Sequence, residues 1–260
     1  MSSQERSLRV EAVVLHHSEW GEADRLLTLF TRELGRVRAV AKGVRKARSR
    51  KAGHLEPFTR SSLQLAQGRD LFIITQAEAV ETYSTLKDDL VSLGYASYIV
   101  ELLTRFTYEE GENRALYRLL VNSLNRLNRG DDPVVTTHYY EIRLLDLVGF
   151  RPQLFTCAQC EKEIQPEDQF FSANQGGALC PQCGNHTPGA RPIRMQALKY
   201  LRHYQRSSYQ DVLRSHFDSD TQAEIEIFMQ YYLTHILERG LNSPAFIHRM
   251  KQEQSKQNSP

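Results

Sequence analysis

Four cysteines constrain this chain more than any other feature of its sequence. Cys157, Cys160, Cys180 and Cys183 form two CxxC pairs separated by 19 residues, and the chain has no other cysteine. Each pair can present two thiolates to one tetrahedral cation, and the intervening residues can fold back to unite the pairs, as in zinc ribbons. We therefore predict one structural zinc ion. Disulfides and four reduced thiols without a metal are the alternatives.

The predicted zinc ion is expected to stabilise the fold and not to catalyse a reaction. Four sulfur ligands fill a tetrahedral shell and leave no position for a reactive water molecule. His186 lies three residues after Cys183 and could replace one cysteine, but we interpret it as a surface residue. The chain has no Walker loop and no GxGxxG, GxSxG or HExxH motif, so we expect no enzymatic activity.

Positive charge is concentrated in one segment of the chain. Residues 32–60 contain ten Lys or Arg and two Glu, a net charge of +8, whereas the whole chain carries +2. A localised positive surface can bind a polyanion while the rest of the molecule stays neutral or acidic. We predict that eight cations contact phosphates: Arg36, Arg38, Lys42, Arg45, Lys46, Arg48, Arg50 and Lys51. The alternative is a solvated basic loop with no partner.

The N-terminal part has the periodicity of β-strands. Five short apolar or alternating runs occur before residue 81, at 8–15, 25–31, 36–42, 63–65 and 71–75. Gly35 can supply the positive φ of a tight turn, and alternation after it puts Arg36, Arg38 and Lys42 on one face. We predict a small OB-type barrel over residues 1–80, although periodicity alone also allows another five-stranded sheet.

Two features lie in the connections of this predicted barrel. The segment from Gly43 to Arg60 is too long for a hairpin loop, and long loops inside compact domains are usually functional or disordered. Trp20 lies in the predicted loop between the first two strands. It either stacks on a nucleobase or anchors that loop.

Helical periodicity begins after Glu81. Asp132 and Pro133 are expected to start a helix that ends near Gly149. Pro192 is expected to open another helix, and Thr221 has capping-box spacing to Glu224.

These patterns predict an α+β protein with an N-terminal five-stranded OB-type β-barrel and an α-helical domain that carries a zinc-ribbon-like insert. The expected helical domain covers residues 81–250, the four-cysteine zinc-finger insert interrupts it at 155–188, and 251–260 form a flexible tail. No run approaches the roughly 18 apolar residues that span a bilayer, and Met1–Leu8 shows no secretory signal. We expect a reducing, cytoplasmic location and no membrane partner.

Two short motifs resemble a known family. Residues 42–46 (KGVRK) and 53–58 (GHLEPF), followed by the late CxxC pairs, are similar to the RecO family of bacterial recombination-mediator and DNA repair proteins. The similarity covers nearly the whole chain, including Val10–Leu15, Glu22–Thr31 and the Gly149–Pro152 entry to the insert. Some members of the family lack the cysteines, so the zinc prediction depends on this sequence alone.

The resemblance implies a function as well as a fold. It implies an OB-fold domain joined to a helical domain with a zinc finger or a metal-free equivalent. It further implies binding of single- and double-stranded DNA, annealing of complementary strands, and loading of RecA, with the partner RecR, onto DNA coated by single-strand-binding protein (SSB). Contact with the SSB tail and association with the bacterial nucleoid are also implied.

Two other classes of function remain open at this point. One is a zinc-ribbon adaptor whose basic loop binds acidic protein partners without binding DNA. The other is a nuclease or glycosylase that has a DNA-binding barrel and an unrecognised active site.

Overall fold

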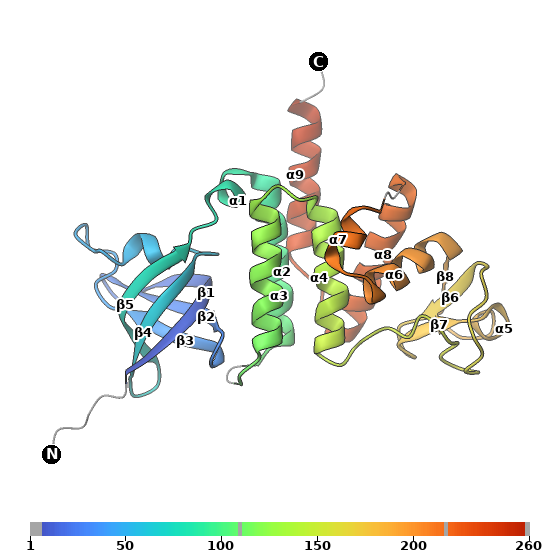
Figure 1. Cartoon of the computed structure of the whole chain (residues 1–260), viewed down its shortest axis with the longest axis horizontal. Helices are drawn as coiled ribbons and strands as arrows, with labels where there is room; N and C mark the ends of the chain where they lie inside the picture. Colours follow the sequence, from blue (N-terminus) through green and yellow to red (C-terminus); the bar gives the residue numbers. More distant parts are fainter. Residues whose placement is uncertain (1–6, 109–110, 216–217, 258–260) are drawn as a thin grey trace. The chain divides into compact units, whose positions relative to one another are not determined.

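The computed structural model describes residues 7–108, 111–215 and 218–257, with side chains as far as Met250. Its contacts divide the chain into two compact units (Figure 1). Unit 1 comprises Met1–Asp131 with Phe246–Pro260, and unit 2 comprises Asp132–Ala245. None of the described helices is both long enough and apolar enough to cross a membrane.

Unit 1 begins with the predicted five-stranded barrel, which is confirmed. Its strands are β1 (Ser7–Trp20), β2 (Asp24–Thr31), β3 (Gly35–Ala41), β4 (Arg60–Gln67) and β5 (Phe72–Glu81). They close in the order β1-β2-β3-β5-β4, with β3 and β5 parallel and the other pairs antiparallel. Gly35 turns the chain between β2 and β3 at φ 68°, and its backbone lies against the Gly111 carbonyl, so no side chain fits there.

The barrel core includes residues from the connection between β3 and β4. Inward-facing residues such as Val14, Leu27 and Ala39 pack together with Val44 and Leu55 of this connection. Leu55 ends a single 3₁₀ turn, η1 (Ala52–Leu55). The segment 43–60 is therefore folded onto the barrel by its own apolar residues, and its cations lie on an ordered backbone.

A β-bulge changes the direction of the side chains in β1. The pairing with β2 shifts between Val14 and His16, so Leu15 is the extra residue. Val14 faces the core, and without the bulge every second residue after it would do the same. The strand also continues to Trp20, beyond the predicted end at residue 15.

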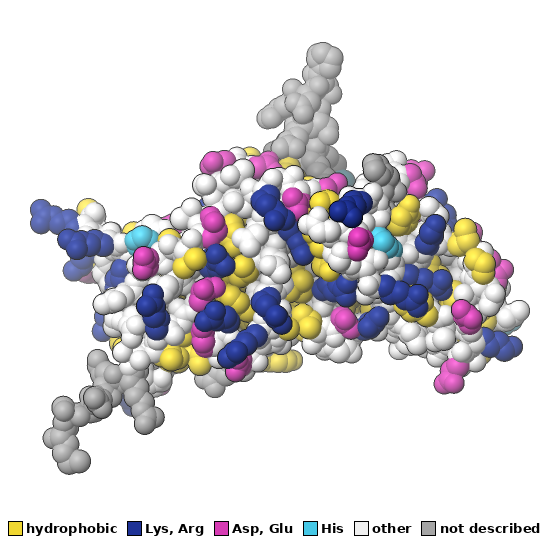
Figure 2. Space-filling view, viewed as in Figure 1, with side chains coloured by type: hydrophobic (Ala, Val, Ile, Leu, Met, Phe, Trp, Pro, Cys, Tyr) yellow, Lys and Arg dark blue, Asp and Glu magenta, His cyan; other side chains and the backbone are white. Residues whose placement is uncertain are grey.

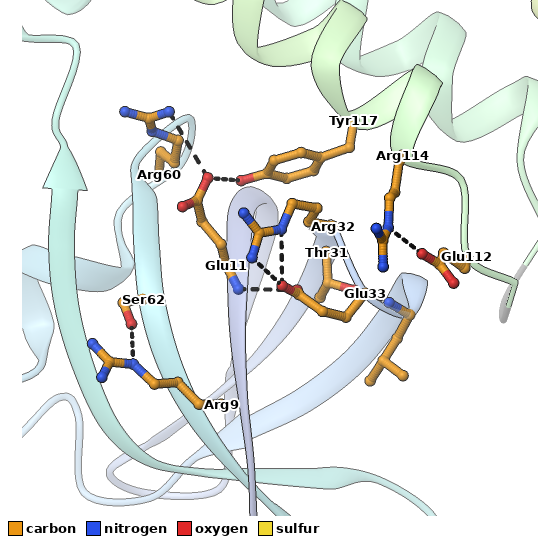
Figure 3. Close-up of polar contacts among 11 residues, drawn as sticks. Arg9, Glu11, Thr31, Arg32, Glu33, Arg60, Ser62, Glu112, Arg114 and Tyr117 are labelled. Atoms are coloured by element: carbon orange, nitrogen blue, oxygen red, sulfur yellow. Dashed lines mark hydrogen bonds and ion pairs between the residues drawn. The ribbon is translucent and has the colours of Figure 1, made fainter.

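Unit 1 also contains the helices α1 (Ser84–Asp88), α2 (Leu90–Phe106) and α3 (Arg114–Asn128). The Tyr117 hydroxyl of α3 donates to Glu11 Oε1 at 3.0 Å, and Arg60 pairs with the same carboxylate at 3.8 Å (Figure 3). The Tyr117 ring stacks on Phe30, with centroids 6.4 Å apart. These contacts attach α3 to one part of the outer surface of the barrel.

The last helix, α9 (Ser243–Gln257), returns to unit 1. Its Phe246 and Ile247 lie so close to Gly94 of α2 that an added Cβ would be 3.3–3.4 Å from them. The backbone of the predicted flexible tail is helical to Gln257, and residues 258–260 lie outside the described residues.

Unit 2 combines five helices with a small sheet among its described residues. The helices are α4 (Pro133–Leu147), α5 (Pro181–Gly184), α6 (Met195–Arg206), α7 (Tyr209–Leu213) and α8 (Ser219–Leu237). The strands β6 (Gln169–Ser172), β7 (Gly177–Leu179) and β8 (Arg191–Ile193) pair in the order β7-β6-β8. Phe171 of β6 packs edge-on against Phe228 and Tyr232 of α8, so the sheet and the helix share one core.

Three predicted helix boundaries in unit 2 can be compared with the structure. Asp132 caps α4 as expected and accepts hydrogen bonds from Val134 and Val135. The prediction for Pro192 was wrong, because this residue lies in β8 and the helix begins at Met195. The cap of α8 is Asp218 and not Thr221, because the Asp218 carboxylate accepts from both the backbone N–H and the hydroxyl of Thr221.

Candidate nucleic-acid interface and metal centre

All eight predicted phosphate-contacting residues lie in unit 1, on β3 and the first part of its connection to β4. The backbone of this connection is tied to the turn between β1 and β2. Gly43 N donates to Asp24 Oδ1 at 2.7 Å, and Arg45 N donates to the Ala23 carbonyl at 2.9 Å. The basic segment is therefore held at the end of the hairpin that carries Trp20.

The far end of the same connection is fixed by Glu56 and His54. Glu56 accepts hydrogen bonds from Arg25 at 2.8 Å and His17 at 3.4 Å. Partial burial opposes ionisation of Glu56, but Arg25 and His17 outweigh burial and hold its pKa below the usual value. His54 Nδ1 accepts from Ala79 N of β5 at 3.1 Å. The GHLEPF motif thus positions the loop.

Six of the eight cations are exposed on this ordered surface, and five of these six differ from Arg45 in their lack of a polar partner among the described residues. No polar partner is recorded for the side chains of these five within residues 7–108, 111–215 and 218–257. Lys and Arg side chains gather at the tip of the connection, at the far left of Figure 2. The five residues are Arg38, Lys42, Lys46, Arg48 and Arg50.

The other three cations have partners in unit 1. Arg36 donates to the Thr104 carbonyl near the C-terminus of α2 at 2.7 Å. Arg45 pairs with Glu19 at 2.9 Å and donates to the Glu22 carbonyl at 3.2 Å. Lys51 donates to the Ile74 carbonyl at 3.1 Å, and burial lowers the pKa of Lys51. These side chains support the fold of the basic segment.

The strand register shows which residues share the outer face with the free cations. Directly paired residues point to the same side of a sheet, and Leu27 and Leu29 point inward, so Asp24, Leu26 and Thr28 point outward. Trp20 opposes Asp24, and Arg38 opposes Thr28. Trp20 therefore lies on the outer face with Arg38, and its side chain is 47% exposed. Simple alternation along β1 predicts the opposite orientation, because it cannot reveal the bulge.

The four cysteines converge in unit 2. Cys157 and Cys160 lie on a tight turn beside the Thr156–Glu163 bridge, and Cys180 and Cys183 lie around the start of α5. All four Sγ atoms lie within 4.8 Å of one another. Their positions agree with a single metal site, and exposed His186 is not part of the group.

The distances in this cluster fit a tetrahedral metal ion. Cys160 Sγ and Cys180 Sγ are 3.8 Å apart, and four sulfurs at metal–sulfur distances of about 2.3 Å would be about 3.8 Å from one another. Burial opposes ionisation of the Cys157 thiol, but backbone N–H groups, including that of Cys180 at 3.4 Å, lower its pKa. Thiolate is the form that binds metal. The four cysteines could thus hold a metal ion.

A close contact between α5 and β6 fixes the position of the second cysteine pair. An added Cβ on Gly184 would lie 2.3 Å from the ring of Phe170, so α5 can lie against β6 only with glycine at this position. The second cysteine pair is held against the small sheet in this way.

Unit 2 also has an open groove of about 920 Å³ beside the first cysteine turn. The guanidinium of Arg206 lies 3.5 Å from the centre of the Phe155 ring, and that of Arg202 lies 5.2 Å from it. Lys199 adds a third positive charge to the lining, and Glu161 and Glu163 add two negative charges. Two other arginines of unit 2 have acidic partners: Arg194 pairs with Glu224, and Arg214 with Asp211.

A closed five-stranded barrel with a basic outer surface, followed by helices and a four-cysteine cluster, defines an OB-type protein with a second, helical unit. Comparisons with known proteins agree with this class. A family model described as "Recombination protein O N terminal" matches residues 3–83, and one described as "Recombination protein O C terminal" matches residues 87–245.

Individual relatives support the same assignment. The chain is 41% identical over 249 residues to "DNA repair protein RecO" of Roseiflexus sp. (strain RS-1), which covers 96% of this chain and 88% of the relative. Proteins of the same name from Pelotomaculum thermopropionicum and Dehalococcoides mccartyi (strain CBDB1) are 35% and 32% identical, with 94% and 89% of this chain covered and 94% and 91% of the relatives. The chain belongs to the RecO family. Its role therefore lies in DNA repair and recombination.

Proposed function

We propose that the chain binds single- and double-stranded DNA through the basic surface of its barrel and anneals complementary strands without enzymatic chemistry. The observation that carries this proposal is the group of five exposed cations without a recorded partner on an ordered segment of unit 1. Arg36, Arg45 and Lys51 belong to the same proposed surface and mainly hold its shape.

The expected binding mode is electrostatic. Cations that neutralise backbone phosphates release condensed counterions, which gives affinity with little sequence preference. Repulsion between phosphate backbones opposes the pairing of two strands. Neutralising both strands lowers this barrier, so annealing requires no nucleotide hydrolysis.

Annealing requires the protein to contact two strands. We propose that the groove in unit 2 supplies a second anion-binding surface through Lys199, Arg202 and Arg206. Phe155 supports this proposal because its ring orients both guanidinium groups, which leaves their donors fixed before an anion binds.

We propose zinc as the ion of the four-cysteine cluster, because four thiolates match its preferred soft, tetrahedral ligand set. With all four positions filled by sulfur, zinc would supply cross-linking energy to the insert and no catalytic water. Cys157, Cys160, Cys180 and Cys183 would be its ligands.

We further propose, from family membership, that the chain acts with RecR and SSB in loading RecA, in the bacterial cytoplasm at the nucleoid. No membrane partner is proposed. Fluorescence anisotropy with each purified protein would test the two direct partners.

The central experiment is annealing of two complementary labelled oligonucleotides without ATP. We expect the protein to make annealing faster than the spontaneous reaction. When Mg²⁺ is added, we expect both strands to stay at full length. Strand cleavage would support the nuclease or glycosylase alternative instead. Absence of any DNA binding at low salt, together with binding to acidic proteins, would support the adaptor alternative.

A further inference from the structure

We propose that Trp20 is the base-stacking residue of the barrel surface and makes that surface prefer unpaired strands. This inference depends on the proposed function and names the chemical group, an unstacked nucleobase, that one part of the site recognises. The basic side chains alone contact phosphates, which single and double strands both present. An aromatic face adds affinity only where a base is free to stack on it.

The first step of the argument is the orientation of Trp20. Trp20 directly opposes Asp24 in the register of β1 and β2. Leu27 and Leu29 of β2 belong to the barrel core, so alternation along the strand puts Asp24 on the outer side of the barrel. The bulge at Leu15 therefore places Trp20 on the outer face.

The second step is the position of Trp20 relative to the cations. Arg25 pairs with Ala41, the last residue of β3, so Lys42, which follows β3 directly, lies beyond Asp24 in the row that begins with Trp20. Two strand spacings separate the backbones at Trp20 and Lys42, which corresponds to about 10 Å. A nucleotide stacked on the indole can place a neighbouring phosphate near Lys42. Arg38 lies on the same face, four residues back along β3.

The third step is that Trp20 does not serve as a buried anchor. Its side chain is 47% exposed, whereas Phe30 and Tyr83, which do anchor unit 1, are at most 1% exposed. The turn beside Trp20 is instead held by polar contacts of Arg45 with Glu19 and with the carbonyls of Gly21 and Glu22. The indole is therefore available to a ligand on a rigid support.

The fourth step is the polarity of the surface around the indole. The neighbouring outward positions of β2 and β3, Leu26 and Val40, form an apolar floor next to Trp20, in which Leu26 is partly buried and Val40 is 8% exposed. Arg38 and Lys42 flank this floor. An apolar strip with cations at its edge suits a base on the strip and phosphates along the edge.

The chain has a single tryptophan, so fluorescence excited at the red edge of the indole absorption band, where the twelve tyrosines do not absorb, reports on this position alone. We expect oligo(dT) to quench the Trp20 emission of the full-length protein, and a duplex of equal length to quench it much less at equal saturation. Saturation is measured independently by the anisotropy of a labelled oligonucleotide.

Variants provide the second readout. Trp20→Ala should weaken binding of oligo(dT) by about tenfold, within a range of about 5- to 150-fold for one lost stacking contact. Duplex affinity and the salt slope should change little, and Trp20→Phe should keep most of the single-strand affinity. Tyr108→Ala is the matched control, because it removes another exposed aromatic side chain from unit 1 and should leave both affinities unchanged.

The outcomes separate this inference from the proposed function. Normal binding of oligo(dT) with no change in Trp20 fluorescence and no effect of Trp20→Ala would overturn the stacking role and leave DNA binding intact. An equal loss of affinity for both kinds of strand would also overturn it. Failure of the wild-type protein to bind any DNA would reject both proposals. If Trp20→Ala does not fold, two other measurements test the stacking role: the quenching of wild-type Trp20 fluorescence by oligo(dT), and the affinity of Trp20→Phe for oligo(dT). No quenching, or a large loss of single-strand affinity in a folded Trp20→Phe, would overturn the stacking role.

Discussion

The most direct test of the basic surface is simultaneous replacement of Lys46, Arg48 and Arg50 by alanine. These three cations are exposed, lie on one ordered segment and have no recorded polar partner among the described residues, so their loss should not disturb the fold. We expect the variant to melt within a few degrees of the wild-type protein.

The magnitude follows from the number of phosphate contacts removed. Each contact with single-stranded DNA contributes about 0.7 to the slope of log affinity against log salt concentration, so three contacts contribute about 2. Raising the salt from 50 to 200 mM should therefore weaken wild-type binding about 20-fold more than it weakens binding of the triple variant. The assay is a titration of labelled oligo(dT) at four salt concentrations.

The control is a triple variant with the same change of charge, Arg69→Ala, Arg118→Ala and Arg239→Ala. These residues are exposed and lie outside the proposed surface. We expect the salt slope of the control to stay near the wild-type value. If the Lys46, Arg48 and Arg50 variant keeps the wild-type slope, or if both variants lose it equally, the DNA contacts lie elsewhere and the reasoning fails.

Three further predictions address stability and the metal. Arg36→Ala should lower the free energy of unfolding by about 1.5–3 kcal/mol in urea denaturation, because it removes a charged hydrogen bond to the Thr104 carbonyl; no loss of stability would show that Arg36 is free. Glu56 has a folded-state pKa below its ordinary value of 4.5, so the stability that it contributes is present above that pH and is lost as the pH falls through the lower, folded-state value. Glu56→Gln should therefore make the melting temperature less steeply dependent on pH below about 5, and an unchanged acid profile would contradict the role of Arg25 and His17. Replacing Cys157 and Cys180 together by Ser should abolish metal binding and lower the melting temperature of unit 2, because a closed metal site contributes directly to folding. Elemental analysis should find one zinc per wild-type chain, and unaltered melting with no metal in the wild-type protein would reject the assignment.

Much of the fold could be predicted because local patterns report on local structure. Alternation identified the five strands, and Asp132 with Pro133 identified the start of α4. The errors at Pro192 and Thr221 have a shared cause: in both places the local pattern is compatible with more than one structure. A proline that permits a helix start also fits the edge of a short sheet, and the spacing of Thr221 to Glu224 does not show that the Asp218 side chain accepts the hydrogen bonds that cap α8.

The sequence also predicted only part of each candidate site. Spacing alone indicated that the four cysteines form one group, because each CxxC turn brings its own pair together. Charge segregation indicated a basic segment, but not which cations are free. Arg36 and Lys51 bind carbonyls of α2 and β5, which are 68 and 23 residues away in the chain. Such partners have no signature in local sequence.

The amino-acid sequence by itself determined that this chain has a basic segment within a β-rich domain and a four-cysteine cluster within a helical one. Residue type and spacing carry that information, because charge, apolar alternation and thiol pairs act over a few residues. Only the tertiary structure decided that the basic segment folds onto the barrel through Val44 and Leu55, and that one extra residue at Leu15 turns Trp20 to the outer face that also carries Arg38. Side-chain direction after a bulge depends on pairing with another strand, and that pairing forms only when the barrel closes.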